Sequence, residues 1–134
     1  MTRIANTAPL RQREPSEKDR RYLSWLHDEK IPCIACLIEG HSHNMRLEAA
    51  HQHLDIAAKG WTSQRGKKVS DSRSVILCST HHRLAPDACD VNQRAFWDRL
   101  RIGDEVADLC TDLYAAYQRG QDGAAVIRRW ARNG

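Results

Sequence analysis

The stretch VILCSTHHRLA, Val75–Ala85, joins a short apolar run to a cysteine and two adjacent histidines. Cys78 precedes His81 by three residues and His82 by four. The β-branched run SVILCS predicts a strand, and THHRLA predicts the start of a helix that is broken near Pro86. A hydrophobic core has no need of a thiol and two imidazoles so close together. The stretch therefore indicates a metal site, and the question is which other residues share it.

A second pair of thiols lies upstream in the segment PCIAC, where Cys33 and Cys36 have C-x-x-C spacing. Two such pairs of soft donors, each presented from a tight turn, supply the four tetrahedral ligands that a structural zinc requires. The predicted zinc ligands are therefore Cys33, Cys36, Cys78 and His81. A redox-active C-x-x-C pair is the alternative, but it lacks the thioredoxin-like βαβ context. Cys89 is interpreted as a spare thiol rather than a replacement zinc ligand.

Composition indicates a small soluble domain. Its 134 residues suffice for one domain with a modest core. No apolar run approaches the roughly 18 residues that cross a bilayer, and the N-terminus shows no secretory signal, so we expect a cytoplasmic protein with reduced thiols. Each of three basic clusters alone is explained by a solvated surface. Together with the net charge of +4, they shift the interpretation toward a nucleic-acid partner.

The chain divides into an N-terminal arm and one domain. Residues 1–15 are polar and contain two prolines, which predicts a flexible basic arm. Residues 16–134 predict a single domain, with a core at about 30–90 and C-terminal helices at about 92–132. The segment LEAAHQHLDIA, residues 47–57, alternates as a strand does, although its alanines also suit a helix, and we prefer the strand. A long polar loop occupies residues 59–74. The combination of predicted strands in the core with helices at the C-terminus predicts an α+β fold.

His82 does not fit the same metal site as His81, because neighbouring residues of a helix point about 100° apart. It therefore faces a second site. His51 and His53 are predicted to share one face of the upstream strand, and the polar loop brings Asp71 after them. One imidazole that abstracts a proton and another that binds a divalent cation are the parts needed to hydrolyse a phosphodiester.

The series PCIAC, EAAHQH, GKKVSD and VILCSTHH, in this order, resembles the HNH nucleases of the His-Me finger, or ββα-metal, superfamily. The similarity is closer to small phage and prophage HNH proteins related to the recombination-enhancement nuclease. It spans roughly residues 21–102. The resemblance implies a small ββα-metal core with a structural zinc, flanked by N-terminal and C-terminal helices. It also implies a metal-dependent endonuclease that acts on DNA.

The resemblance assigns roles by position. His51 corresponds to the general base that activates water, and Asp71 to the middle polar residue that orients this base or supports the loop. His82 corresponds to a ligand of the catalytic cation, Mg²⁺ or Mn²⁺. The predicted zinc ligands match the family's structural zinc positions, with a histidine where many members have the fourth cysteine. Backbone phosphates of DNA would contact the basic residues of this region, Lys67, Lys68, Arg73 and Arg83.

The chain departs from the family pattern at Ala50, where many HNH enzymes have Asp or His as a second ligand of the catalytic cation. Either His53 or Asp55 replaces that ligand, or His82, phosphate and water hold the ion alone. Two other functions therefore stay open beside the nuclease. One is a catalytically inactive, zinc-stabilised module that binds nucleic acid, and the other is a thiol oxidoreductase. The histidines of GHSHN, His41 and His43, are interpreted as solvated loop residues.

Overall fold

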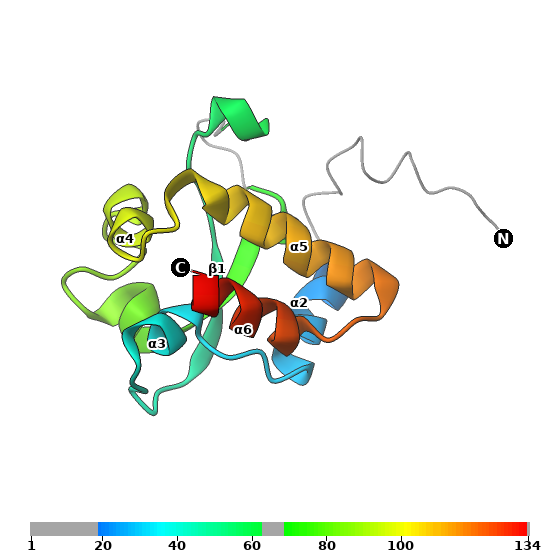
Figure 1. The fold of residues 1–134 in the computed structure, drawn as a ribbon, viewed down its shortest axis with the longest axis horizontal. Coiled ribbons are helices and arrows are strands. Elements are labelled where there is room, and N and C mark those ends of the chain that lie inside the picture. The colour runs from blue at the N-terminus through cyan, green and yellow to red at the C-terminus, as the bar shows by residue number, and fades with distance from the viewer. Residues whose placement is uncertain (1–18, 63–68, 134) are drawn as a thin grey trace, which may run out of the picture.

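The computed structural model describes residues 19–62 and 69–133, where helices surround a small antiparallel sheet (Figure 1). The α-helices are α2 (Arg20–Asp28), α3 (Ile34–Glu39), α4 (Gln93–Arg99), α5 (Val106–Arg119) and α6 (Gly123–Asn133). The strands are β1 (Leu47–His51) and β2 (Ser74–Cys78). Single 3₁₀ turns occur at Ala57–Lys59, Asp71–Arg73 and Gly103–Glu105, and a π-helical turn at Thr80–Leu84. The predicted mixture of helix and strand is confirmed, and the predicted arm, residues 1–15, lies outside the described residues.

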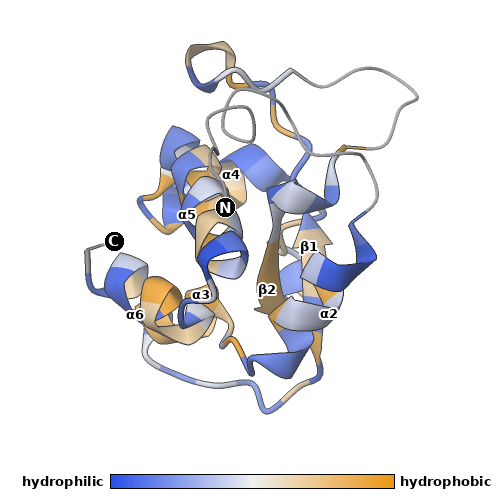
Figure 2. Ribbon diagram, turned by 90° about the vertical axis from the view of Figure 1, so that its right-hand side faces the viewer, coloured by the Kyte–Doolittle hydropathy of each residue, from blue (hydrophilic) through white to orange (hydrophobic). Residues whose placement is uncertain are grey.

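The two strands form an antiparallel pair in which Leu47 lies opposite Cys78 and His51 lies opposite Ser74. All five residues of β2 are buried, so both of its faces are covered. Helices α2, α3 and α5 contact β2, and α5 and α6 lie in front of the sheet in Figure 1. The apolar colour of β2 in Figure 2 reflects the β-branched run that was predicted as a strand. The buried strand β2 therefore fixes the position of Cys78, its last residue, and of the turn that carries the following histidines.

The predicted strand at residues 47–57 is too long, because β1 ends at His51. The next residue, Gln52, has a fully buried side chain although it is polar. Its amide nitrogen donates to the Ala50 carbonyl at 3.0 Å, and its amide oxygen accepts from the indole of Trp97 at 2.7 Å. The backbone N–H of Gln52 still bonds the Arg73 carbonyl at 2.8 Å. His53 therefore lies outside the strand, and the prediction that it shares a strand face with His51 is wrong.

The C-terminal helices cover the region that leads into the first cysteine pair. Helix α6 packs on α3 and α5. It begins at Gly123, where an added Cβ would lie 2.6 Å from the Trp25 ring and 2.7 Å from Ile31. The absence of a side chain at Gly123 thus lets the start of α6 lie directly on the segment before Cys33. The helices expected at about 92–132, with an interruption at Gly103, are confirmed.

Helices long and apolar enough to cross a membrane do not occur within residues 19–62 and 69–133.

Candidate metal centre and candidate active site

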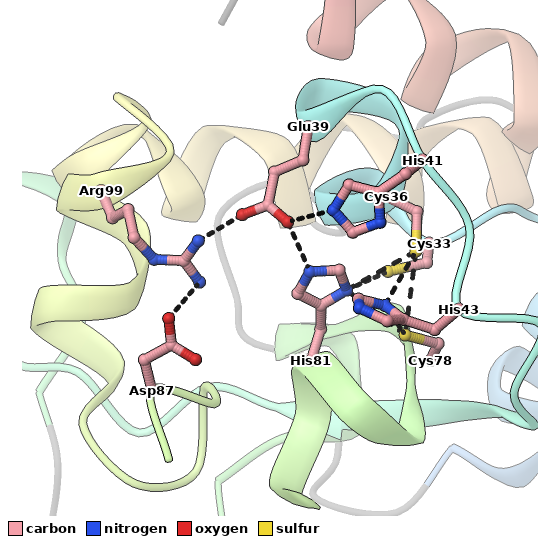
Figure 3. Close-up of polar contacts among 9 residues, drawn as sticks. All are labelled: Cys33, Cys36, Glu39, His41, His43, Cys78, His81, Asp87 and Arg99. Atoms are coloured by element: carbon pink, nitrogen blue, oxygen red, sulfur yellow. Dashed lines mark hydrogen bonds and ion pairs between the residues drawn. The ribbon is translucent and has the colours of Figure 1, made fainter. Parts of the chain in front are cut away.

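Four soft donors predicted as zinc ligands converge at one end of the sheet (Figure 3). Cys33 precedes α3 and Cys36 lies within it, while Cys78 ends β2 and His81 lies in the Thr80–Leu84 turn. One ligand atom from each residue lies within 4.8 Å of the others. The cluster therefore joins α3 to the strand-to-helix junction, and a metal ion such as zinc could bind here.

The spacing of the donors fits a tetrahedral zinc ion. The His81 Nδ1 atom lies 3.6 Å from Cys33 Sγ, 3.5 Å from Cys36 Sγ and 3.3 Å from Cys78 Sγ. The sulfurs of Cys36 and Cys78 are 3.8 Å apart. Zinc bonds of about 2.3 Å to sulfur and about 2.0–2.1 Å to nitrogen give tetrahedral edges of about 3.8 Å and about 3.6 Å. These distances leave room for one zinc ion at the centre of the four donors.

Burial of the thiols makes a bound cation important for their ionisation. Burial raises the pKa of Cys33 to about 12, and it also raises the pKa of Cys36. Thiolates, not thiols, are the zinc ligands, so the metal must displace protons from these buried groups. The charge of the bound cation would then offset the cost of burying thiolates.

A carboxylate orients the histidine ligand of the cluster. The His81 Nε2–H group donates to Glu39 Oε1 at 2.8 Å, and Arg99 forms an ion pair with the other Glu39 oxygen. Burial raises the pKa of Glu39, but the hydrogen bonds from His81 and Arg99 outweigh burial and leave its pKa below the usual value. Because the Glu39 carboxylate accepts a hydrogen bond from the Nε2–H group of His81, the Nδ1 lone pair of His81 faces the cysteine sulfurs. Metal-binding histidines are commonly supported in this way.

Replacing Glu39 with alanine should weaken zinc binding by about 10- to 100-fold, because His81 would lose the partner that fixes its tautomer. A competition titration with a chromogenic chelator measures this change. Glu29, exposed at the end of α2, provides the matched control Glu29→Ala, which should bind zinc as the wild type does. Equal zinc affinity in Glu39→Ala and the wild type would show that the carboxylate plays no part in metal binding.

The loop histidines behave differently from the expectation that both are solvated. His43 Nδ1 lies 3.6 Å from Cys78 Sγ and 3.9 Å from Cys36 Sγ, so the prediction is wrong for His43. His41 is 48% exposed and bonds Glu39 Oε1 at 3.1 Å. Gly40, with φ of +77°, ends α3 and turns the chain so that these histidines return toward Cys36. A His-x-His pair directly after a glycine that ends the C-x-x-C helix was the available sequence signal.

The remaining described cysteines lie outside the cluster. The Cys89 thiol is buried and contacts the Gln52 amide oxygen at 3.6 Å, and burial raises its pKa to about 12. Cys110 is buried in α5 as part of the hydrophobic core. Neither belongs to a group of possible metal donors within the described ranges. This placement supports the interpretation of Cys89 as a spare thiol.

His51 and Asp71 are brought together at the end of β1. The His51 Nε2 atom lies 2.7 Å from Asp71 Oδ1, and the His51 side chain is 33% exposed. The second Asp71 oxygen accepts the backbone N–H of Asp19 at 2.6 Å, and Asp19 in turn accepts from the Tyr114 hydroxyl. Asp19, the N-cap residue of α2, therefore fixes one oxygen of the Asp71 carboxylate while the other oxygen faces the His51 imidazole. His51 combines an oriented ring with access to solvent.

The backbone around His51 is also fixed. The Gln93 side-chain amide donates to the His51 carbonyl at 3.0 Å and accepts from the His53 N–H at 2.7 Å. Gln93 is the first residue of α4, which Asn92 caps by accepting from the Ala95 N–H. One glutamine thus joins the end of β1 to a helix that starts about 40 residues later.

His82 lies between two carboxylates. Its Nδ1 atom is 2.7 Å from Glu48 Oε1 and its Nε2 atom is 3.2 Å from Asp90 Oδ2, while the side chain is 14% exposed. Arg83 forms two hydrogen bonds with Glu48, and this guanidinium lowers the pKa of Glu48 to about 2. Glu48 is therefore a carboxylate that accepts the Nδ1 proton of His82, and Nε2 faces Asp90.

His51 and His82 make no direct contact with each other in the part of the chain that the structure describes. Successive side chains of a strand point to opposite faces, so Glu48 and Ala50 share the face toward His82 and His51 points to the other. His53 is exposed, and neither it nor Asp55 belongs to a described group of metal donors. The structure instead brings Glu48 and Asp90 to His82, and sequence analysis missed both.

No family model, curated protein or solved structure matches this chain.

The predicted DNA contacts differ in their accessibility. Arg73 is only 7% exposed, and its guanidinium lies 4.8 Å from the Trp61 ring centroid. This burial contradicts its prediction as a surface contact for phosphates. Arg83 is exposed but is engaged by Glu48. Lys67 and Lys68 lie outside the described residues.

Proposed function

We propose that this protein is a metal-dependent DNA endonuclease of the HNH type, in which β1, β2 and the Thr80–Leu84 turn act as a ββα-metal core. The observation that carries the proposal is the pair formed by His51 and Asp71, at 2.7 Å. A partly exposed imidazole whose second nitrogen is fixed by a carboxylate has the chemistry of a general base. A structural metal site alone would not need this pair.

The proposed reaction begins with proton transfer to His51. Asp71 accepts a hydrogen bond from the Nε2–H group of His51. The Nδ1 lone pair is therefore free to take a proton from water as the water oxygen attacks phosphorus. The bond to the 3′-oxygen then breaks, and this oxygen takes a proton from water while His51 returns its proton to solvent, giving 5′-phosphate and 3′-hydroxyl ends. Asp71 acts as a positioning residue, because it holds the imidazole in the tautomer that can accept the proton.

The second carboxylate-bound histidine provides donors for a hard divalent cation. Glu48 accepts a hydrogen bond from the Nδ1–H group of His82, and the Nε2 atom of the ring faces an Asp90 oxygen at 3.2 Å. Two acceptors at this distance require a proton or a cation between them. Octahedral Mg²⁺ with bonds of about 2.1 Å has ligands about 3 Å apart, which fits the donor pair. For a Mg²⁺ or Mn²⁺ ion bound here to stabilise charge on the phosphorane and the departing oxygen, the phosphate must reach both this ion and His51, which lie toward opposite faces of β1.

The inactive, zinc-stabilised module that binds nucleic acid is the second candidate. Ala50 supplies no ligand on the strand face that His82 shares with Glu48. The lack of direct contact between His51 and His82 in the described ranges also favours this candidate. Binding of DNA without cleavage at any divalent cation concentration would identify it.

A plasmid-nicking assay tests the proposal. Purified protein is incubated with supercoiled DNA and Mg²⁺ or Mn²⁺, and the formation of nicked circles is measured with and without EDTA. The proposal requires nicking that depends on the added cation. Nicking that persists in EDTA, or no nicking with either cation, would contradict it.

Replacing Asp90 with asparagine should raise the Mg²⁺ concentration that gives half-maximal nicking by about tenfold or more. The substitution keeps the size of the side chain but removes the charge that faces His82 Nε2. Asp87→Asn is the matched control, because Asp87 is 68% exposed and pairs with Arg99 at 3.7 Å, away from His82. An unchanged Mg²⁺ dependence in Asp90→Asn would exclude Asp90 as a ligand.

A further inference from the structure

Five donors, one more than tetrahedral zinc uses, surround the candidate zinc site. His43 Nδ1 lies 3.6 Å from Cys78 Sγ and 3.9 Å from Cys36 Sγ, which are close to the tetrahedral sulfur–nitrogen edge of about 3.6 Å. Figure 3 shows the His43 ring directed at these sulfurs from the loop after α3. Its ring centroid lies 4.6 Å from that of His81. Two histidines therefore face the same three-cysteine platform.

The two histidines differ in how they are supported. His81 Nδ1 approaches all three sulfurs within 3.6 Å, and Glu39 holds its other ring nitrogen. The His43 contacts within hydrogen-bond range involve two of the sulfurs and are longer. His81 is thus the better placed fourth ligand, and His43 lies beside the edge between Cys36 and Cys78.

We propose that His43 is a reserve zinc ligand, which occupies the fourth position when His81 leaves it. In this exchange the His43 Nδ1 lone pair forms a bond to zinc as the bond from His81 Nδ1 breaks. Both rings stay neutral, so no proton or electron is transferred, and the three thiolates remain bound. The cluster would accordingly be a three-cysteine platform with two interchangeable histidines. This inference does not depend on the proposed nuclease activity.

Removal of each histidine tests the proposal through the metal content. His81→Ala should retain zinc after gel filtration, whereas His81→Ala/His43→Ala should bind zinc at least about tenfold more weakly than His81→Ala. The matched control is His81→Ala/His53→Ala, because His53 is an exposed histidine that belongs to no described group of metal donors. It should behave as His81→Ala does. Zinc is measured by elemental analysis, and Co²⁺ absorption reports whether four-coordinate geometry persists.

Equal zinc affinity of His81→Ala and the His81→Ala/His43→Ala variant would overturn the proposal, as would equal losses in the His53 and His43 double variants. Circular dichroism at saturating zinc shows whether each variant is folded.

A second measurement keeps all four primary ligands and therefore does not depend on the folding of His81→Ala. In the wild type, a reserve ligand should recapture zinc each time His81 dissociates. His43→Ala should therefore release zinc to excess chelator about threefold faster or more, a difference of about 0.65 kcal/mol in barrier, while His53→Ala releases it at the wild-type rate. Identical release rates in His43→Ala and the wild type would contradict a reserve role.

Discussion

Replacing His51 with alanine should lower the rate of plasmid nicking by about a thousandfold, because general-base catalysis contributes about 10²- to 10⁴-fold. The imidazole pairs with Asp71 through Nε2, so its loss removes the proton acceptor and leaves the carboxylate in place. His51 is partly exposed at the end of β1, and its side chain contributes little to the core. Zinc content and the thermal unfolding midpoint should therefore change little.

The measurement compares initial nicking rates at saturating Mg²⁺ and the affinity for a labelled duplex. His53→Ala is the matched control, because His53 lies two residues away and is exposed. It should nick at nearly the wild-type rate, which would also exclude it as a ligand of the catalytic cation. His51→Ala should bind DNA as the wild type does. Nicking by His51→Ala at the wild-type rate would remove His51 from the mechanism.

The four residues of the candidate metal centre could be predicted from sequence because their positions depend on local spacing. A C-x-x-C pair and a C-x-x-H pair each bring two donors to one turn, whatever the rest of the chain does. His43 was missed because its approach to the sulfurs depends on the turn at Gly40 and on the path of the following loop. Asp90 was missed for a related reason, since it meets His82 through a turn whose backbone returns to bond the His82 carbonyl.

Tertiary contacts also decided where the first strand ends. The alternation of residues 47–57 continues past His51, but the residue-by-residue pairing with β2 ends at His51, and the Gln52 side chain is buried with hydrogen bonds to Ala50 and Trp97. The prediction for Arg73 failed for a similar reason. A positive charge in the sequence suggested a surface contact for phosphates, but in the folded chain the Arg73 side chain is buried and lies against the Trp61 ring. Periodicity and charge report the local preference of a segment, and long-range packing determines whether that preference is expressed.

Replacing Cys78 with alanine should abolish zinc binding at micromolar metal and lower the unfolding midpoint by about 10 °C or more. A structural zinc contributes several kcal/mol or more to folding, and a loss of about 3 kcal/mol in a domain of this size corresponds to about 10 °C. The cysteine ends the buried strand β2, and its sulfur lies 3.8 Å from Cys36 Sγ. Loss of the metal would release α3 from the Thr80–Leu84 turn and so disturb the His82 region as well.

Cys110→Ala is the matched control, because it removes the same sulfur from a buried position in α5, away from the metal centre. It should cost about 1 kcal/mol and leave one zinc bound. Prolonged treatment of the wild type with a strong chelator should lower its midpoint to about that of Cys78→Ala, and the same treatment should leave Cys78→Ala unchanged. Equal midpoints for the two alanine variants, with no response of the wild type to chelator, would show that the cysteines contribute only packing. A drop confined to Cys78→Ala and to the chelated wild type would establish that one metal ion joins the first cysteine pair to the end of β2.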